Sequence, residues 1–135
     1  MYKTVNYDGE IRASASKKTA KANIKLWLSN KPTFKINNLK INEYFNNSIC
    51  KLVIFNVFDI LKYSNFSIDA KVYGGGLTSQ AYALRLAIIK CILSLNKELK
   101  KVFRDHGYVT TDCRSVERKK YGLAKARKSF QYSKR

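Results

Sequence analysis

Residues 114–135 combine positive charge with aromatic rings in a pattern suited to binding nucleic acid. They include nine Lys or Arg residues and one acid, Glu117, with Tyr121, Phe130 and Tyr132 spaced among the cations. Arg side chains fork onto phosphates, Lys supplies point charge, and aromatic rings stack on bases. With few branched apolar residues, burial does not offset a backbone ordering cost of roughly 1 to 2 kcal/mol per residue. We expect this segment to order on a polyanion, and a solvated extension is the alternative that its composition leaves open.

The whole chain carries a large excess of positive charge. Its 135 residues include 27 basic and 9 acidic ones, for a formal net charge of +18. A charge of this size repels itself and implies a large anionic partner. Nucleic acid fits better than a membrane surface, because no apolar run is long enough to span a bilayer and the basic segment lacks an apolar stripe. No membrane partner is expected.

Three consecutive glycines, Gly74, Gly75 and Gly76, separate a predicted strand from a predicted helix. At such a position backbone N–H groups can meet a phosphate, and glycine lets the backbone approach it closely. The spacing matches neither common glycine-rich nucleotide-binding loop. An RNA backbone is therefore the preferred ligand, and a tight turn without a ligand is the alternative. Arg85 lies further along the same helix and is placed either to reach these phosphates or to lie in solvent.

No group of residues in the sequence predicts catalysis or metal binding. Asp105 and His106 are adjacent, but adjacent side chains rarely point the same way, so we do not expect a catalytic pair. Cys50, Cys91 and Cys113 are far apart and lack the close spacing of zinc ligands. We expect free thiols in a reducing compartment, no cofactor, no metal and no enzymatic activity.

Apolar periodicity predicts strands that alternate with helices. The predicted strands are residues 21–28, 33–36, 53–58 and 66–73. The predicted helices are residues 39–45, 78–95 and 97–105, with helical turns at 49–52 and 59–63. A single helix over residues 49–61 is the alternative to the strand at 53–58. Thr78 or Ser79 is the expected N-cap of the long helix, and Gly107 is placed to end the last one.

These elements predict one α+β or α/β domain of two layers. Residues 1–20 have little periodicity and are predicted to form an N-terminal arm that lies on the partner. Residues 21–110 are the predicted globular domain, and residues 111–135 an extended basic RNA-binding tail.

Three groups of residues occur together in an order that chance does not explain. The first is Gly74, Gly75 and Gly76 with Gln80 and Arg85. The second is Glu117, Arg118, Lys119 and Lys120 with Gly122, Lys125, Ala126 and Arg127, and the third is Ser133, Lys134 and Arg135. With these groups, residues 66–135 resemble the universal small-subunit ribosomal protein number nine family, of the bacterial or organellar type. The match is looser upstream, where residues 10–13 (Glu-Ile-Arg-Ala) occupy positions at which the family usually has consecutive basic residues.

The resemblance implies an α+β two-layer sandwich: a four-stranded sheet with packed helices and a left-handed βαβ crossover, plus the extended basic C-terminal tail. It implies a structural constituent of the small ribosomal subunit that binds rRNA in the head, beside neighbouring head proteins. The tail is expected to contact P-site tRNA during translation. A free RNA-binding chaperone and an RNA-processing enzyme are the alternatives.

The site residues follow from the resemblance together with the charge pattern. The expected rRNA-binding residues are Lys17, Lys18, Gly74, Gly75, Gly76, Gln80, Arg85, Arg114, Arg118, Lys119, Lys120, Lys125, Arg127 and Lys128. The expected tRNA-binding residues are Ser133, Lys134 and Arg135.

The composition also bears on where the protein works. Of the 27 basic residues 20 are Lys, and Asn, Ile and Tyr are plentiful, as expected of an AT-rich genome. The first residues include Asp8 and Glu10 and show neither a secretory signal nor a transit peptide. Together with the bacterial-type tail, this predicts a ribosome in the mitochondrial matrix, with the plastid stroma and a bacterial cytoplasm as alternatives.

Overall fold

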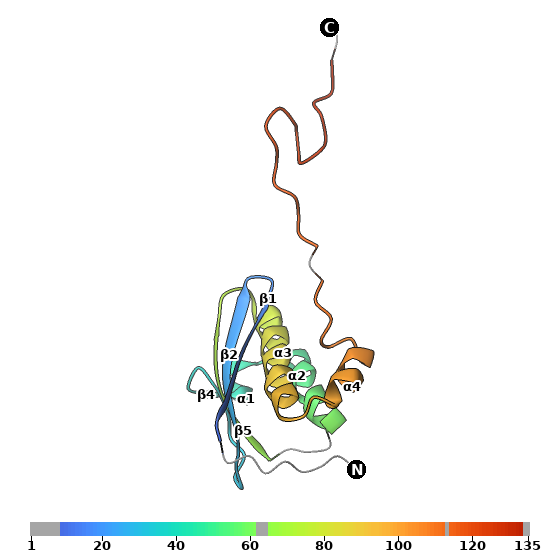
Figure 1. Ribbon diagram of the computed structural model, residues 1–135. Helices are drawn as coiled ribbons and strands as arrows, with labels where there is room; N and C mark the ends of the chain where they lie inside the picture. Colours follow the sequence, from blue (N-terminus) through green and yellow to red (C-terminus); the bar gives the residue numbers. More distant parts are fainter. Residues whose placement is uncertain (1–8, 62–64, 113, 134–135) are drawn as a thin grey trace.

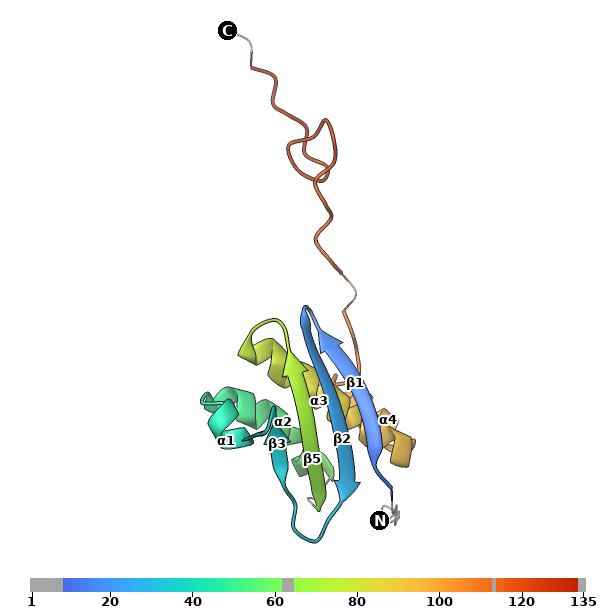
Figure 2. The ribbon, with the colours of Figure 1, turned by 90° about the vertical axis from the view of Figure 1, so that its left-hand side faces the viewer.

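The computed structural model describes residues 9–61, 65–112 and 114–133, which form a sheet, a layer of helices and a long tail (Figure 1). The strands are β1 (Ile11–Lys17), β2 (Ala20–Leu28), β3 (Phe34–Ile36), β4 (Leu39–Lys40) and β5 (Phe66–Tyr73). The helices are α1 (Ile41–Tyr44), α2 (Ser48–Leu61), α3 (Leu77–Leu95) and α4 (Leu99–Asp105). The larger helices α2 and α3 cover one face of the sheet, and β1, β2 and β5 are bare on the other (Figure 2). The predicted α+β class is confirmed.

The sheet is mixed, with the strand order β1-β2-β5-β3-β4. Strand β2 pairs antiparallel with both β1 and β5, and β3 pairs antiparallel with β4. Strands β3 and β5 are parallel neighbours, so the chain must cross over between them, and it does so through α1 and α2. The left-handed sense expected for this crossover stays a prediction.

The sheet has five strands in the described residues rather than the expected four. Strand β1 lies inside the segment that was expected to be an arm, so that expectation is wrong over Ile11–Lys17. Residues 1–8 lie outside the described residues. Alanine and serine alternate through β1, and because these residues differ little in size and polarity, the alternation is hard to recognise. Strand β4 takes the first two residues of the helix predicted at 39–45, which shortens that helix to α1.

The strand predicted at residues 53–58 is wrong, because Ser48–Leu61 forms one continuous helix, α2. Its buried residues recur at helical spacing: Cys50, Val53, Ile54 and Val57. Ile49, Leu52 and Phe55 are also apolar, although they are 63%, 60% and 41% exposed. An apolar run that continues on both sides of a helix hides the helical period and looks like a buried strand.

The remaining elements agree with the periodicity. Strands β2, β3 and β5 confirm the predictions at 21–28, 33–36 and 66–73, and helices α3 and α4 confirm those at 78–95 and 97–105 within one or two residues. Gly107 follows α4 with φ of 70°, the left-handed conformation that commonly ends a helix. Within the described ranges, no helix is long and apolar enough to cross a bilayer.

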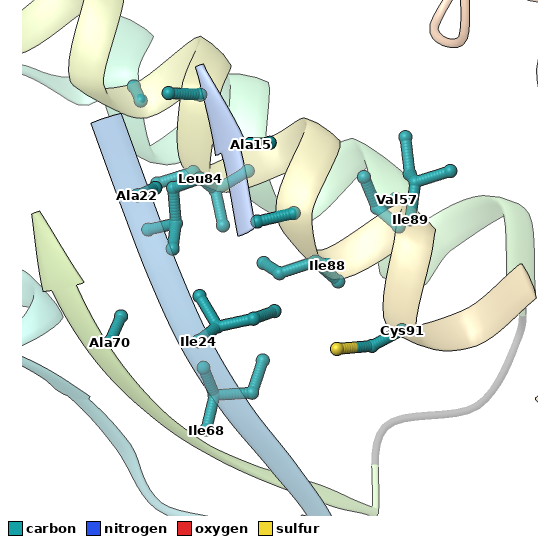
Figure 3. Packing of buried hydrophobic residues seen from close by; sticks show 14 of the residues in the cluster. Ala15, Ala22, Ile24, Val57, Ile68, Ala70, Leu84, Ile88, Ile89 and Cys91 are labelled. Atoms are coloured by element: carbon teal, nitrogen blue, oxygen red, sulfur yellow. The ribbon is translucent and has the colours of Figure 1, made fainter. Parts of the chain in front are cut away.

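The core is the layer between α3 and the strands (Figure 3). Leu84 and Ile88 of α3 lie over Ile24 of β2, and both are fully buried. The sheet offers small side chains at several central positions, among them Ala15, Ala22 and Ala70. Small residues let the helix approach the sheet closely, so α3 occupies a fixed position over β1 and β2.

Cys91 at the lower end of this interface is a free, fully buried thiol, and burial raises its pKa from 9.0 to about 12. In the unfolded chain the thiol ionises from about pH 9, whereas the folded state holds it neutral, so its contribution to stability is lost as pH rises from 9 towards 12. We therefore predict that the difference in free energy of unfolding between the unsubstituted chain and Cys91→Ala narrows over that range. Urea denaturation of both chains at matched salt measures it, and two curves that stay parallel with pH would contradict the prediction.

Candidate nucleic-acid interface

Three segments that are far apart in sequence meet at one end of the domain (Figure 1). They are the β1–β2 turn, the glycine loop of residues 74–76, and the start of the tail around Asp112. The carbonyl oxygen of Thr19 lies 2.6 Å from the place of a Cβ on Gly74, so the turn and the loop touch. Hydrogen bonds from Arg114 lower the pKa of the Asp112 carboxyl, and the charge of Lys17 adds to this effect. We call this region the turn end.

The three glycines of the loop differ in what the fold requires of them. Gly74 and Gly75 have φ of 75° and 61°, a region that other residues rarely adopt. A Cβ on Gly75 would also stand 3.1 Å from the Ala20 nitrogen. Gly76 has φ of −101°, and a Cβ there would meet nothing within 4 Å. A tight turn therefore explains why residues 74 and 75 are glycines, but it does not explain the glycine at position 76.

Helix α3 begins at the turn end without a side-chain cap. Its N-cap is Gly76, which makes no side-chain hydrogen bond, so the expectation that Thr78 or Ser79 caps the helix is wrong. The helix begins earlier than expected because Gly76 already has the extended geometry of an N-cap. The first N–H groups of an α-helix have no partner within it and lie at the positive end of the helix dipole. These groups suit an anion.

Gln80 supports the glycine loop through a side-chain hydrogen bond. The residue is buried, with 8% of its surface exposed. Its Nε2 donates to the Gly74 carbonyl oxygen at 3.0 Å, and its Oε1 accepts from the Tyr44 hydroxyl at 2.8 Å. Both ends of this amide are engaged, so Gln80 acts on a ligand through the loop that it supports.

Arg85 lies between two tyrosine rings. Its guanidinium carbon is 4.8 Å from the centre of the Tyr82 ring and 4.2 Å from that of Tyr108. Its Nε is buried and lacks a hydrogen-bond partner among the described residues. Tyr108 belongs to the segment that leads into the tail, so these cation–π contacts fasten the root of the tail to α3.

Lys17 and Lys18 lie at the corner of the β1–β2 hairpin. Lys18 has φ of 54° and is exposed, and Lys17 is half-buried. The pairing of Lys17 with Ala20 leaves Lys18 and Thr19 as the turn, which places both lysines beside the glycine loop.

The tail leaves the domain and runs away from it, interrupted by one loop (Figure 1). At its root, Arg114 makes a two-pronged ion pair with Asp112, with its closest contact at 2.8 Å. Further out, Arg127 donates to both carboxylate oxygens of Glu117, with Nε at 3.0 Å from Oε2. The Ala124 amide donates to the Lys128 carbonyl at 2.7 Å inside this loop. The one acid of the segment therefore folds residues 117–128 back on themselves, and it engages Arg127 in doing so.

The rest of the charged tail is open to solvent. Five cations are exposed and make no ion pair with any described residue: Arg118, Lys119, Lys120, Lys125 and Lys128. Tyr121, Phe130 and Tyr132 are also exposed. Ser133 is exposed as well, and the predicted tRNA-binding residues Lys134 and Arg135 lie outside the described residues. The arrangement offers charge and flat rings to a ligand that approaches from several sides.

The geometry does not assemble a metal centre in the described ranges, where no three His, Cys, Asp or Glu side chains gather. His106 is exposed at the end of α4, with its ring centre 5.8 Å from that of Tyr108.

Sequence reasoning missed two kinds of residue at this site. Tyr82 and Tyr108 hold Arg85, yet they are 26 positions apart and no local pattern joins them. Glu117 closes the tail loop through its hydrogen bonds with Arg127. The sequence shows that Glu117 is the one acid among many cations, but it does not show which cation pairs with it.

Comparison with known proteins places the chain in a family. The family model described as ribosomal protein S9/S16 matches residues 15–135. The small ribosomal subunit protein uS9 of Cytophaga hutchinsonii is 37% identical over 126 residues, which cover 93% of this chain and 98% of that protein. The protein uS9c of Chlorella vulgaris is 39% identical over 124 residues, 90% of each chain. The match to uS9 of Rhodococcus opacus, 43% identical over 103 residues, covers 76% of this chain and 61% of that protein.

These matches cover both the domain and the tail, and they bear out the resemblance that the glycine loop and the basic tail indicate. The chain therefore belongs to the ribosomal protein S9/S16 family, whose members are structural components of the small ribosomal subunit and not enzymes.

Proposed function

We propose that the chain binds rRNA in the head of the small subunit through its turn end and tail, and that Ser133, Lys134 and Arg135 contact P-site tRNA. One observation carries the rRNA contact: the exposed tail, with five cations free of ion pairs to described residues, starts at the same end of the domain as the uncapped N-terminus of α3. Phosphates satisfy both features, because they accept from helix N–H groups and neutralise Lys and Arg. Contacts with neighbouring proteins of the head complete the proposal.

The tail divides into two parts with different tasks. Residues 114–128 contain the loop closed by Glu117 and Arg127, and this compact, cationic part clamps rRNA beside the domain. Residues 129–133 continue beyond it, and the proposed task of residues 129–135 is to contact tRNA. Counterion release from about nine phosphates gives a slope of roughly −6 to −8 for the logarithm of the binding constant against that of salt concentration.

The glycine loop allows a test that separates folding from binding. We predict that Gly76→Ala changes the free energy of unfolding by less than about 1 kcal/mol, because its backbone is ordinary and its Cβ meets open space. The same change weakens rRNA binding by about tenfold, because the methyl group holds a phosphate away from N–H donors worth roughly 1.5 kcal/mol.

Gly74→Ala is the matched control for this loop. It lowers the free energy of unfolding by about 1 to 3 kcal/mol, because its φ is positive and its Cβ meets the Thr19 carbonyl. Urea denaturation and filter binding to a transcribed small-subunit rRNA head domain measure the two effects. If Gly76→Ala bound the rRNA with unchanged affinity, the three glycines would serve only to form a tight turn and not to bind a phosphate.

Deleting residues 133–135 tests the tRNA contact. We predict that the truncated chain still assembles into small subunits, because the clamp and the domain remain, and that these subunits retain P-site tRNA less well. Replacing Arg118, Lys119 and Lys120 together by Gln is expected to impair assembly instead, because it removes charge from residues 114–128, the part of the tail proposed to clamp rRNA. Reconstituted subunits and a tRNA dissociation assay measure both. Equal tRNA retention with and without residues 133–135 would remove the tRNA contact from the proposal.

We infer that the ribosome in question is mitochondrial, because an AT-rich coding pattern and a bacterial-type tail occur together; the plastid stroma and a bacterial cytoplasm are the alternatives. The chloroplast and bacterial relatives support a ribosomal location in general. We predict that the endogenous protein sediments with mitochondrial small subunits in high-magnesium buffer. Recovery at the top of the gradient would favour a free RNA chaperone, and sedimentation with plastid or bacterial subunits would change the compartment.

A further inference from the structure

The sheet has a second face, opposite α3, which no described helix covers (Figure 2). We call it the open face and define it by the outward residues of β1, β2, β3 and β5. Those residues alternate with the buried ones along each strand, as the pleat requires. They are Arg12, Ser14, Ser16, Lys21, Asn23, Lys25, Trp27, Lys35, Asp69, Lys71 and Tyr73.

The register brings the cations of the open face into neighbouring positions. Arg12 stands opposite Lys25, which stands opposite Asp69, and Asp69 stands opposite Lys35 on the far side. In the next row, Asn23 stands between Ser14 and Lys71. The face thus presents a continuous row of charge across four strands and a row of hydroxyl, amide and ammonium groups beside it.

This arrangement is unfavourable for the chain on its own. Like charges placed directly opposite each other destabilise a sheet, and Arg12 and Lys25 are such a pair. Glu10 relieves part of the repulsion, since it accepts from Arg12 at 2.9 Å and lies 3.5 Å from Lys25. Lys21 and Lys71 are diagonal neighbours on β2 and β5, and neither makes an ion pair with a described residue. The face therefore carries five cations against Asp69 and the flanking Glu10, and an anion would relieve their repulsion.

A shallow depression of about 350 Å³ lies in the middle of the open face. Its lining includes Arg12, Ser14, Asn23, Lys25, Asp69 and Lys71. Three cations and two neutral hydrogen-bonding side chains outnumber the one carboxylate there, Asp69, and such cations and donors suit phosphate and ribose oxygens.

We propose that the open face binds the phosphate backbone of a second rRNA segment, on the side of the domain opposite α3. The inference rests on the proposed function and extends it: the domain bridges two RNA segments, one held by the turn end and tail, the other by the sheet. Apart from Trp27 and Tyr73, the outward residues of these strands are charged, hydroxyl or amide side chains. Such a surface lacks the apolar core that a protein partner needs, so RNA is the occupant. Binding is independent of base sequence, because the cations recognise phosphates.

The test compares two triple variants that lose equal charge. The first is Lys21→Gln, Lys35→Gln and Lys71→Gln on the open face, where all three side chains are exposed. The matched control is Lys97→Gln, Lys100→Gln and Lys101→Gln at the exposed surface of α4 and the residues before it, on the helix side. The probe is a transcribed small-subunit rRNA head domain, titrated at a series of salt concentrations. We expect the open-face variant to reduce the salt-dependence slope by about two to three, and the control by less than about one.

A photo-crosslinking side chain at position 23, in the middle of the face, identifies the occupant in assembled subunits without removing a cation. We expect cross-links to rRNA from position 23 and none from position 101 of the control face. Equal slopes for both variants, or cross-links from position 23 only to protein, would overturn the inference while leaving the proposed function intact. Failure of the unsubstituted chain to bind the rRNA probe at low salt would overturn the proposed function itself.

Discussion

The close packing of α3 on β1 and β2 is the interaction on which the rest of the structure depends. Alanines at positions 15, 20 and 22 leave room for the helix, and Ala20 also lies against the glycine loop where that loop meets the β1–β2 turn. The N-terminus of α3 is therefore held beside Lys17 and Lys18. Arg85, on the same helix, makes a cation–π contact with Tyr108 and so fixes the place from which the tail departs. The close packing of this core thus positions the start of α3, the β1–β2 turn and the beginning of the tail, which are the parts of the turn end.

Charge is distributed on this scaffold in a way that favours binding over stability. The ion pairs among the described residues are all exposed, and exposed pairs contribute little free energy. Three acids nevertheless have visible local effects: Glu10 joins Arg12 and Lys25, Asp112 orients Arg114, and Glu117 closes the tail loop. The few acids thereby arrange cations for a partner, and the unpaired cations retain their repulsion until phosphates neutralise it.

The sequence was most informative where apolar and polar residues alternate with a strong contrast. Phe66–Tyr73 and Ala20–Leu28 alternate apolar with charged or polar residues over most of their length, and both are strands as predicted. Prediction failed where the contrast disappears: β1 alternates alanine with serine, and α2 is apolar on its exposed side as well as its buried one. The glycine loop was visible as a site, but which of its glycines the fold requires depends on Thr19, more than fifty residues away. Long-range contacts of this kind, like the one between Arg85 and Tyr108, leave no local pattern.

The central claim is that the turn end meets RNA, with the tail continuing along it. Electron cryomicroscopy of small subunits that contain this chain tests it most directly. The account predicts an rRNA phosphate within hydrogen-bond distance of the backbone N–H groups at Gly76 and Leu77, and density for residues 114–133 surrounded by RNA. A turn end that faces solvent or another protein, with the first N–H groups of α3 far from any phosphate, would contradict it.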